Sequence, residues 1–137
     1  MKVTFESKIT CQAEIDYLRC SPKHHNEPRY DYVLVQTTQG VIFAQLVFLF
    51  NFFIADKTHP VALVHTLRRE LGAERTRRKD RELGFLRLRK QCFEFIWART
   101  ILRGVPIFPA FDNDRDSIVF DIIDADIAIR VQDILNE

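Results

Sequence analysis

Five consecutive residues, DNDRD from Asp112 to Asp116, have the alternating carboxylates that begin a calcium-binding loop. In such a loop alternate residues aim oxygens at one cation, a glycine occupies the sixth position, and a bidentate glutamate occupies the twelfth. Ser117 stands at the sixth position here and Ile123 at the twelfth. The string is therefore predicted to be a solvated turn between strands and not a calcium site.

Three further aspartates follow this string, at positions Asp121, Asp124 and Asp126. Carboxylates that converge from separate strands can hold magnesium for phosphodiester hydrolysis, so a metal-dependent nuclease is one function class to weigh. However, Asp121 alternates with apolar neighbours as an outward-facing strand residue does, and the other two stand where the start of a helix favours negative charge. We predict that the chain is not an enzyme and has no catalytic residues.

Histidine and cysteine are the other residue types that could bind a metal or act as a nucleophile. None has the short spacing of a zinc site, and there is no glycine-rich phosphate loop and no G-x-S-x-G motif. The cysteines form no C-x-x-C pair, so we expect reduced, mostly buried thiols, no metal and no cofactor. The residues considered are His24, His25, His59, His65, Cys11, Cys20 and Cys92.

Charge is unevenly distributed along the chain. Residues 68–90 contain ten basic and four acidic residues, whereas residues 110–137 contain two basic and eight acidic residues. A basic segment can neutralise phosphates without reading sequence, can dock on the acidic end of a second copy, or can be a solvated loop. The residues predicted to contact nucleic acid are Arg75, Arg77, Arg78, Lys79, Arg81, Arg87, Arg89 and Lys90.

The most apolar run of the chain, Val41 to Ala55, raises the question of a membrane span. It is 15 residues long and contains Gln45 and Asn51, whereas a transmembrane helix needs about 20 apolar residues. The run is rich in β-branched and aromatic residues, so it is predicted to be a core strand with no membrane contact. Truncating Phe48 within it to alanine would then cost about 3–5 kcal/mol. No signal peptide is recognisable, so an intracellular location is expected.

The remaining pattern is dominated by short strands. We expect a strand or loose hairpin over residues 3–18, a loop over 21–28, and a hairpin closed at Gly40. Further strands follow at 59–67, 84–91 and 92–111, the last bent at Gly104 and Pro106, with an exposed loop before Leu83. A last strand over 117–123 leads into a helix capped by Asp124 or Asp126.

These elements predict a mainly β (or α+β) protein in which residues 1–137 form one domain. The expected architecture is a partly open β-barrel or a compact sandwich of about seven strands with a C-terminal helix. The helix is expected to bury the face that carries Ile127, Val131, Ile134 and Leu135.

The succession RYDYVLVQT, GVIFAQLVFLF, PVALVH, GFLRLR, ILRGVPIFPAFDND and SIVFDIIDADIAIRV resembles a domain of basidiomycete DNA-transposon proteins of the Plavaka and Kyakuja-Dileera-Zisupton kind. The resemblance covers residues 24–132, and its most specific part is Arg103-Gly104 followed by Pro109, Phe111 and an Asp-rich segment. It carries over no catalytic signature. It implies an accessory module of a DNA-handling, nuclear, fungal protein.

A weaker likeness, carried by YDYVLV and by a later strand leading into ILRG, is to bromo-adjacent homology domains. These are chromatin modules built on a bent β-barrel, and some hold a methylated lysine in an aromatic cage. The likeness implies that Tyr30, Tyr32 and Trp97 could form such a cage. We therefore expect a non-catalytic interaction module that binds nucleic acid or a chromatin protein. The alternative is a homo-oligomerisation or scaffold domain, with a nuclease as the third function class.

Overall fold

The computed structural model describes residues 1–69, 86–110, 115–121 and 123–136. In these ranges the chain consists mainly of β-strands, with a short 3₁₀ turn, Ala98–Thr100, and a C-terminal α-helix. The strands are β1 (Lys2–Glu6), β2 (Ala13–Tyr17), β3 (Cys20–His24), β4 (Glu27–Tyr30), β5 (Tyr32–Thr37), β6 (Gly40–Ile54), β7 (Lys57–Arg69), β8 (Leu86–Trp97), β9 (Ile101–Gly104), β10 (Ile107–Pro109) and β11 (Asp116–Val119), and the helix is α2 (Ala125–Leu135).

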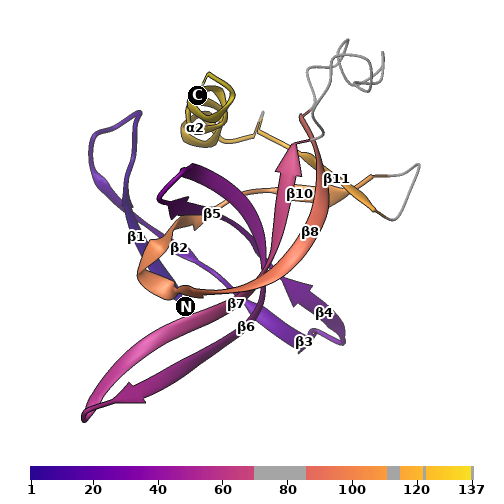
Figure 1. Cartoon of the computed structure of the whole chain (residues 1–137). Helices are drawn as coiled ribbons and strands as arrows, with labels where there is room; N and C mark the ends of the chain where they lie inside the picture. Colours follow the sequence, from indigo (N-terminus) through magenta and orange to yellow (C-terminus); the bar gives the residue numbers. More distant parts are fainter. Residues whose placement is uncertain (70–85, 111–114, 122, 137) are drawn as a thin grey trace.

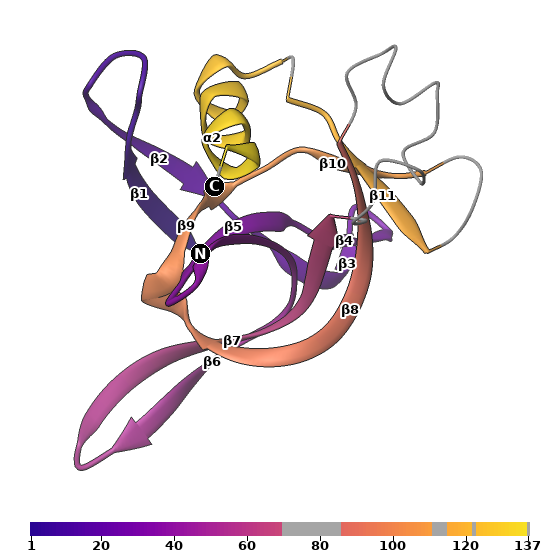
Figure 2. The same cartoon turned by 45° about the horizontal axis from the view of Figure 1, so that its top comes forward.

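Seven strands form the central sheet, in the order β10-β11-β8-β7-β6-β5-β9, with antiparallel neighbours throughout. Figure 2 shows that β5 to β8 curl round strongly. The two edge strands, β9 and β10, are separated only by Val105 and Pro106, so the predicted bend there is confirmed. The sheet is open and sandwich-like rather than a closed barrel, which confirms the predicted mainly β class with a C-terminal helix.

Two hydrophobic clusters lie on opposite faces of the sheet, because side chains alternate along β5: Val33 and Val35 enter one cluster and Leu34 the other. Hairpin β1–β2 covers the first cluster and α2 covers the second (Figure 1). The first contains Val3, Leu18, Val33, Val35, Ala44, Leu46, Ala62, Val64 and Ile101. The second contains Leu34, Phe43, Leu67, Leu88, Val105, Ile107, Val119, Ile127 and Val131.

Helix α2 begins where the sequence predicted. Asp124 is its N-cap in an extended conformation, and the Asp124 side chain accepts a hydrogen bond from the backbone N–H of Ile127 at 3.1 Å. This bond satisfies one of the backbone donors left open at the first turn. Ile127 and Val131 are fully buried beneath the helix, and Ile134 and Leu135 pack against the same cluster.

Several local predictions are confirmed, but one loop is wrong, and the separate strands predicted at 84–91 and from residue 92 are one continuous strand, β8. Residues 3–18 form the hairpin β1–β2, and β5 and β6 pair up to Thr37 and Gly40 as expected. The segment predicted as a loop, 21–28, is instead a second small hairpin, β3–β4. His25 and Asn26 turn the chain with φ angles of 48° and 71°. Two consecutive residues with positive φ suit a two-residue hairpin turn.

Strand β6 is a core strand over only part of its length. Phe43, Ala44 and Leu46 are buried and Leu49 still packs against the first cluster, but from Asn51 to Ile54 every residue is exposed. Together with β7 this end of β6 forms an arm that projects from the sheet (Figure 1). Phe48 is 59% exposed, so the prediction that it lies in the core is wrong. In the described ranges, no helix is long and apolar enough to cross a membrane.

Candidate binding surfaces

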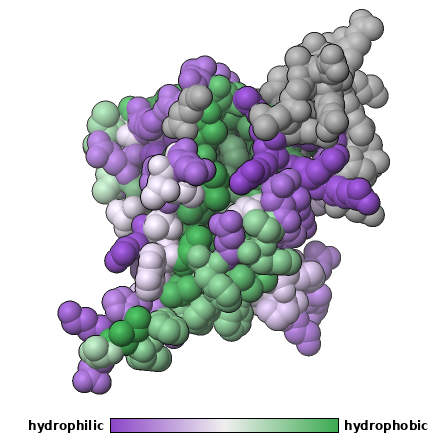
Figure 3. Space-filling model, viewed as in Figure 1, coloured by the Kyte–Doolittle hydropathy of each residue, from purple (hydrophilic) through white to green (hydrophobic). Residues whose placement is uncertain are grey.

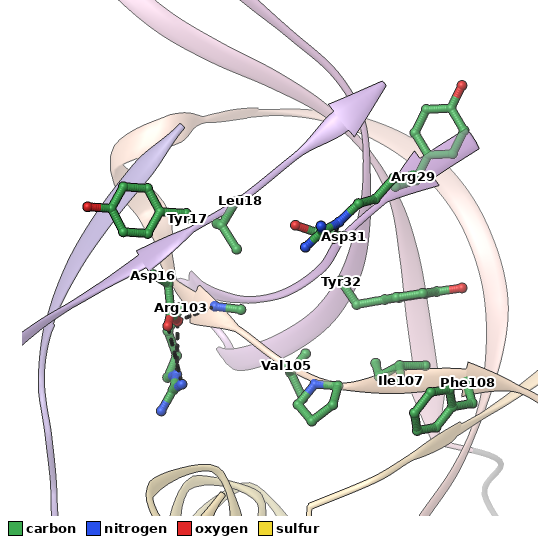
Figure 4. Close-up of a pocket in the computed structure, with 13 residues that line it drawn as sticks. Asp16, Tyr17, Leu18, Arg29, Asp31, Tyr32, Arg103, Val105, Ile107 and Phe108 are labelled. Atoms are coloured by element: carbon green, nitrogen blue, oxygen red, sulfur yellow. Dashed lines mark hydrogen bonds and ion pairs between the residues drawn. The ribbon is translucent and has the colours of Figure 1, made fainter. Parts of the chain in front are cut away.

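A groove of about 380 Å³ lies between β2, β4 and the β9–β10 bend (Figure 4). Asp16 and Arg103 meet at one end of the groove, and Tyr32 and Phe108 lie at the other. The groove also contains the ion pair of Arg29 with Asp31, with Nε and Oδ1 3.0 Å apart. Burial raises the pKa of Tyr32, although a hydrogen bond with Ser117 acts in the opposite direction. The charged side chains that line the groove are therefore paired with one another, Asp16 with Arg103 and Arg29 with Asp31.

Arg103 is the centre of a buried ionic cluster at the wall of this groove. Its guanidinium donates to Asp16 at 3.1 Å, to Asp124 at 3.0 Å and to Asp126 at 2.6 Å. The same group lies 4.1 Å from the centre of the Phe5 ring, a cation–π contact. We call these five residues the Arg103 cluster. It joins β9 to hairpin β1–β2 and to α2.

Protonation in the cluster follows from these contacts. Burial alone would raise the pKa of Asp126, but hydrogen bonds from Arg130, from the Lys8 backbone and from Arg103 outweigh it and hold the pKa below its usual value. Burial would likewise lower the pKa of Arg103, but Asp126 and the other carboxylates raise it. Asp124 and Asp126, weighed above as magnesium ligands, are instead ion-paired with this arginine. The cluster therefore fastens elements of the fold together.

Gly104 lies beside the Arg103 cluster, at a position where a larger side chain would collide with Leu18. A Cβ atom at this position would lie 2.8 Å from Cδ2 of Leu18, which is buried. The Gly104 N–H also donates to Oδ2 of Asp16 at 2.8 Å. The Arg-Gly step singled out in the sequence thus has a packing role at the junction of β9 with β2.

The residues proposed for an aromatic cage are not brought together. Tyr30 and Tyr32 both line the groove, whereas Trp97 lines two other depressions, one with His59 and one with Phe95. The separation follows from topology, because Trp97 ends β8 while the two tyrosines flank the β4–β5 junction. A cage made of these three residues is therefore not formed.

The predicted basic surface is divided between several environments. The positions from Arg75 to Arg81 lie outside the described residues. Arg87 and Arg89 both pair with Asp116, at 3.3 and 2.9 Å, and the side chains of Arg87 and Asp116 are only 10% and 1% exposed. The solvent-exposed basic face that the sequence predicted for this strand, β8, is therefore partly buried, and its charge is partly neutralised by Asp116. Lys90 is exposed, as are Arg68 and Arg69 beside it.

An extended exposed apolar surface lies on β6, β7 and β8. Strand register places its members in cross-strand rows, because directly paired residues of an antiparallel sheet share a face. A groove of about 440 Å³ runs through it, and Figure 3 shows hydrophobic side chains gathered across this part of the molecule and along the arm. We call it the aromatic face: Phe48, Phe50, Phe52, His59, Val61, Leu63, His65, Phe93, Phe95 and Trp97.

The aromatic face continues a core surface. Leu67 lies two residues from His65 on β7, so both point to the same side, and Leu67 belongs to the cluster beneath α2. The helix covers one end of this sheet face and leaves the other end bare. Phe93 is 61% exposed, Phe95 69% and Trp97 40%. With about 200 Å² per aromatic side chain, the five most exposed rings of the aromatic face present on the order of 600 Å² of surface. This area is at the upper end of the range for an apolar patch on a monomer.

Cations border the aromatic face. Lys90 pairs with Leu67 at one end, and at the other end the Arg99 guanidinium lies 5.4 Å from the Trp97 ring centre. Strands β6 and β7 contain no acidic residue, and the single one in β8, Glu94, pairs with buried Val64 on the opposite face. No carboxylate therefore occupies this face on these three described strands.

Sequence reasoning missed this surface. The signal was the alternation of Phe93, Phe95 and Trp97 with Cys92 and Glu94, which indicated one wet face but did not say which. The thiols were also misjudged, since Cys11 and Cys92 are exposed, although all three cysteines are free as predicted. In the described part of the chain, no group of three or more His, Cys, Asp or Glu side chains could hold a metal ion.

Comparison with known proteins identifies no relative: no protein-family model, no curated protein and no solved structure matches this chain. The resemblances to transposon-encoded and bromo-adjacent homology domains stay predictions.

Proposed function

We propose that this chain is a non-catalytic nucleic-acid-binding module whose ligand lies on the aromatic face. One observation carries the proposal: cations border a row of exposed rings on a sheet face where β6, β7 and β8 place no carboxylate. Aromatic rings stack on bases, and lysine and arginine neutralise phosphates. A DNA-handling or chromatin-associated role in the nucleus, as the transposon resemblance implies, belongs to the same proposal.

The charge distribution favours a polyanion over an apolar peptide. Lys90 and Arg69 stand near the α2 end of the face, and Arg99 stands at the opposite end. A ligand lying across the rings meets a cation at each end and, on the described strands β6 to β8, no carboxylate between them. Such contacts do not depend on base sequence. Their affinity falls as the salt concentration rises, because the release of counterions then contributes less free energy.

The test is fluorescence anisotropy of a labelled oligonucleotide titrated with the whole chain. The double variant Phe93→Ala/Phe95→Ala should weaken binding by at least tenfold, since each stacked base contributes about 1–3 kcal/mol. Phe53→Ala is the matched control, because Phe53 is 74% exposed but adjoins Phe52 in β6 and so points to the other side of the arm. Equal affinity in the double variant and the wild type would contradict the proposal.

A second candidate function is self-association through the same surface. Two copies that bury the exposed rings would together cover roughly 1,200 Å², close to the lower limit of specific protein interfaces. Light scattering decides this candidate, since Phe95→Asp should convert a dimer into a monomer while Phe53→Asp should not. Docking of the basic segment on the acidic end of a second copy, the other form of this candidate, should respond to salt instead.

A further inference from the structure

We infer that the ligand of the aromatic face is a single strand, with one unpaired base on each exposed ring of β8. This inference rests on the proposed function and specifies its ligand. Phe93, Phe95 and Trp97 project to the same side of one strand, and between 40% and 69% of each residue is exposed. They form a ladder of three stacking surfaces, which we call the ring ladder.

Spacing excludes a stacked duplex from the ring ladder. Alternate residues of an antiparallel strand are about 6.8 Å apart, because each residue rises about 3.4 Å. Successive base pairs of duplex DNA are about 3.4 Å apart, half that distance, and each base is covered on both sides by its neighbours. A ring can reach a base face only where the bases are splayed apart. An extended single strand offers such bases without the cost of opening a helix.

The rings are held in place before any ligand arrives. His65 stacks on Phe93 with ring centres 4.2 Å apart, and Phe50 meets the Phe95 ring edge-on at 6.0 Å. The ring of His59, on β7, meets the Trp97 ring edge-on, with centres 5.6 Å apart. Burial and the nearby Lys90 charge lower the pKa of His65, so this support is a neutral ring at physiological pH. Fixed side chains lose little freedom on binding, which favours affinity.

The ends of the ring ladder define the phosphate contacts. Lys90 is paired with Leu67 before Phe93, and Arg99, in the turn after β8, lies over the Trp97 ring, so one cation borders each end of the three rings. The three rings themselves offer a single hydrogen-bond donor, the Trp97 indole N–H, which is too few to read a sequence of base edges. The bound strand is therefore expected to run along β8 with little preference for sequence.

The experiment compares an oligothymidylate with a duplex of equal length, using the full chain. Trp97 is the only tryptophan, so its fluorescence reports directly on the ring ladder. Oligothymidylate should quench Trp97 and bind at least tenfold more tightly than the duplex, and Phe95→Ala should weaken this binding roughly tenfold, the cost of one lost stack. Lys90→Ala should reduce the slope of log affinity against log salt by about 0.7, the value for one phosphate of a single strand.

The outcomes separate this inference from the proposed function. Duplex binding as tight as single-strand binding, with unchanged Trp97 fluorescence, would overturn the single-strand inference and leave nucleic-acid binding in place. Failure of both nucleic acids to bind the folded wild type would overturn both. Wild-type affinity in Phe95→Ala, with Phe53→Ala as the matched control on the opposite side of the arm, would also overturn the ring ladder.

Discussion

Replacing Arg103 with methionine should cost about 3 kcal/mol of folding free energy. Removing one member of a buried ion pair typically costs about 3–5 kcal/mol, because the remaining charge is left uncompensated. Asp126, only 6% exposed, would keep the Arg130 guanidinium and the Lys8 backbone N–H, which reduces the cost. Asp16 and Asp124 would be partly solvated, since their side chains are 21% and 35% exposed. The estimate therefore lies at the low end of the range.

Urea denaturation followed by far-ultraviolet circular dichroism measures this loss. With a denaturant slope of about 2 kcal/mol/M, the midpoint should fall by about 1.5 M. Lys8→Ala is the matched control, because Lys8 and Asp133 form an exposed ion pair, and such pairs contribute at most about 1 kcal/mol. Arg103→Lys should lie between, since it keeps the charge but loses the planar donor fork. A loss below about 1 kcal/mol for Arg103→Met would refute the assigned role of the cluster.

Three other outcomes are expected. Asp126 has a lowered pKa in the folded state, so its stabilisation is complete above its unfolded pKa of about 3.9 and is lost as pH falls through the folded value; Asp126→Asn should flatten an acid titration of stability in that range. Phe48→Ala should cost less than about 1 kcal/mol, whereas Leu46→Ala, which truncates a fully buried side chain, should cost about 2–5 kcal/mol. Urea denaturation measures both losses, and equal losses would show that β6 is buried throughout. Gly104→Ala should cost about 1–2 kcal/mol by displacing Leu18, and a thermal midpoint equal to wild type would contradict the close contact.

Elements with strong local signals could be predicted from the sequence. The glycine at position 40 closes hairpin β5–β6 with a φ of 122°, and Asp124 caps α2 as its residue type indicated. The hairpin β3–β4 could not, because its prolines suggested a loop. Proline is tolerated in that hairpin because it forms a separate two-stranded sheet, where many backbone groups have no ladder partner to lose.

The candidate surface depended on tertiary structure. Alternation along β6 and β8 separated two faces but gave no information on which face α2 would cover, and the helix is too short to cover the whole sheet. Hence Phe48 and Trp97 could be assigned to the core or to a cage with equal justification from sequence. The pairing of Arg87 and Arg89 with Asp116 likewise joins residues that are 29 and 27 positions apart, a contact that no local pattern encodes.

A heteronuclear NMR titration of the ¹⁵N-labelled chain with oligothymidylate locates bound nucleic acid on the chain and so tests whether it lies on the aromatic face. We expect the amide shifts to concentrate in residues 59–65 and 93–97, with the Trp97 indole N–H among the largest, and the amides lining the groove beside Arg103 to stay unchanged. Shifts centred on the groove, or on Arg87 and Arg89 with the ring ladder unaffected, would contradict this expectation.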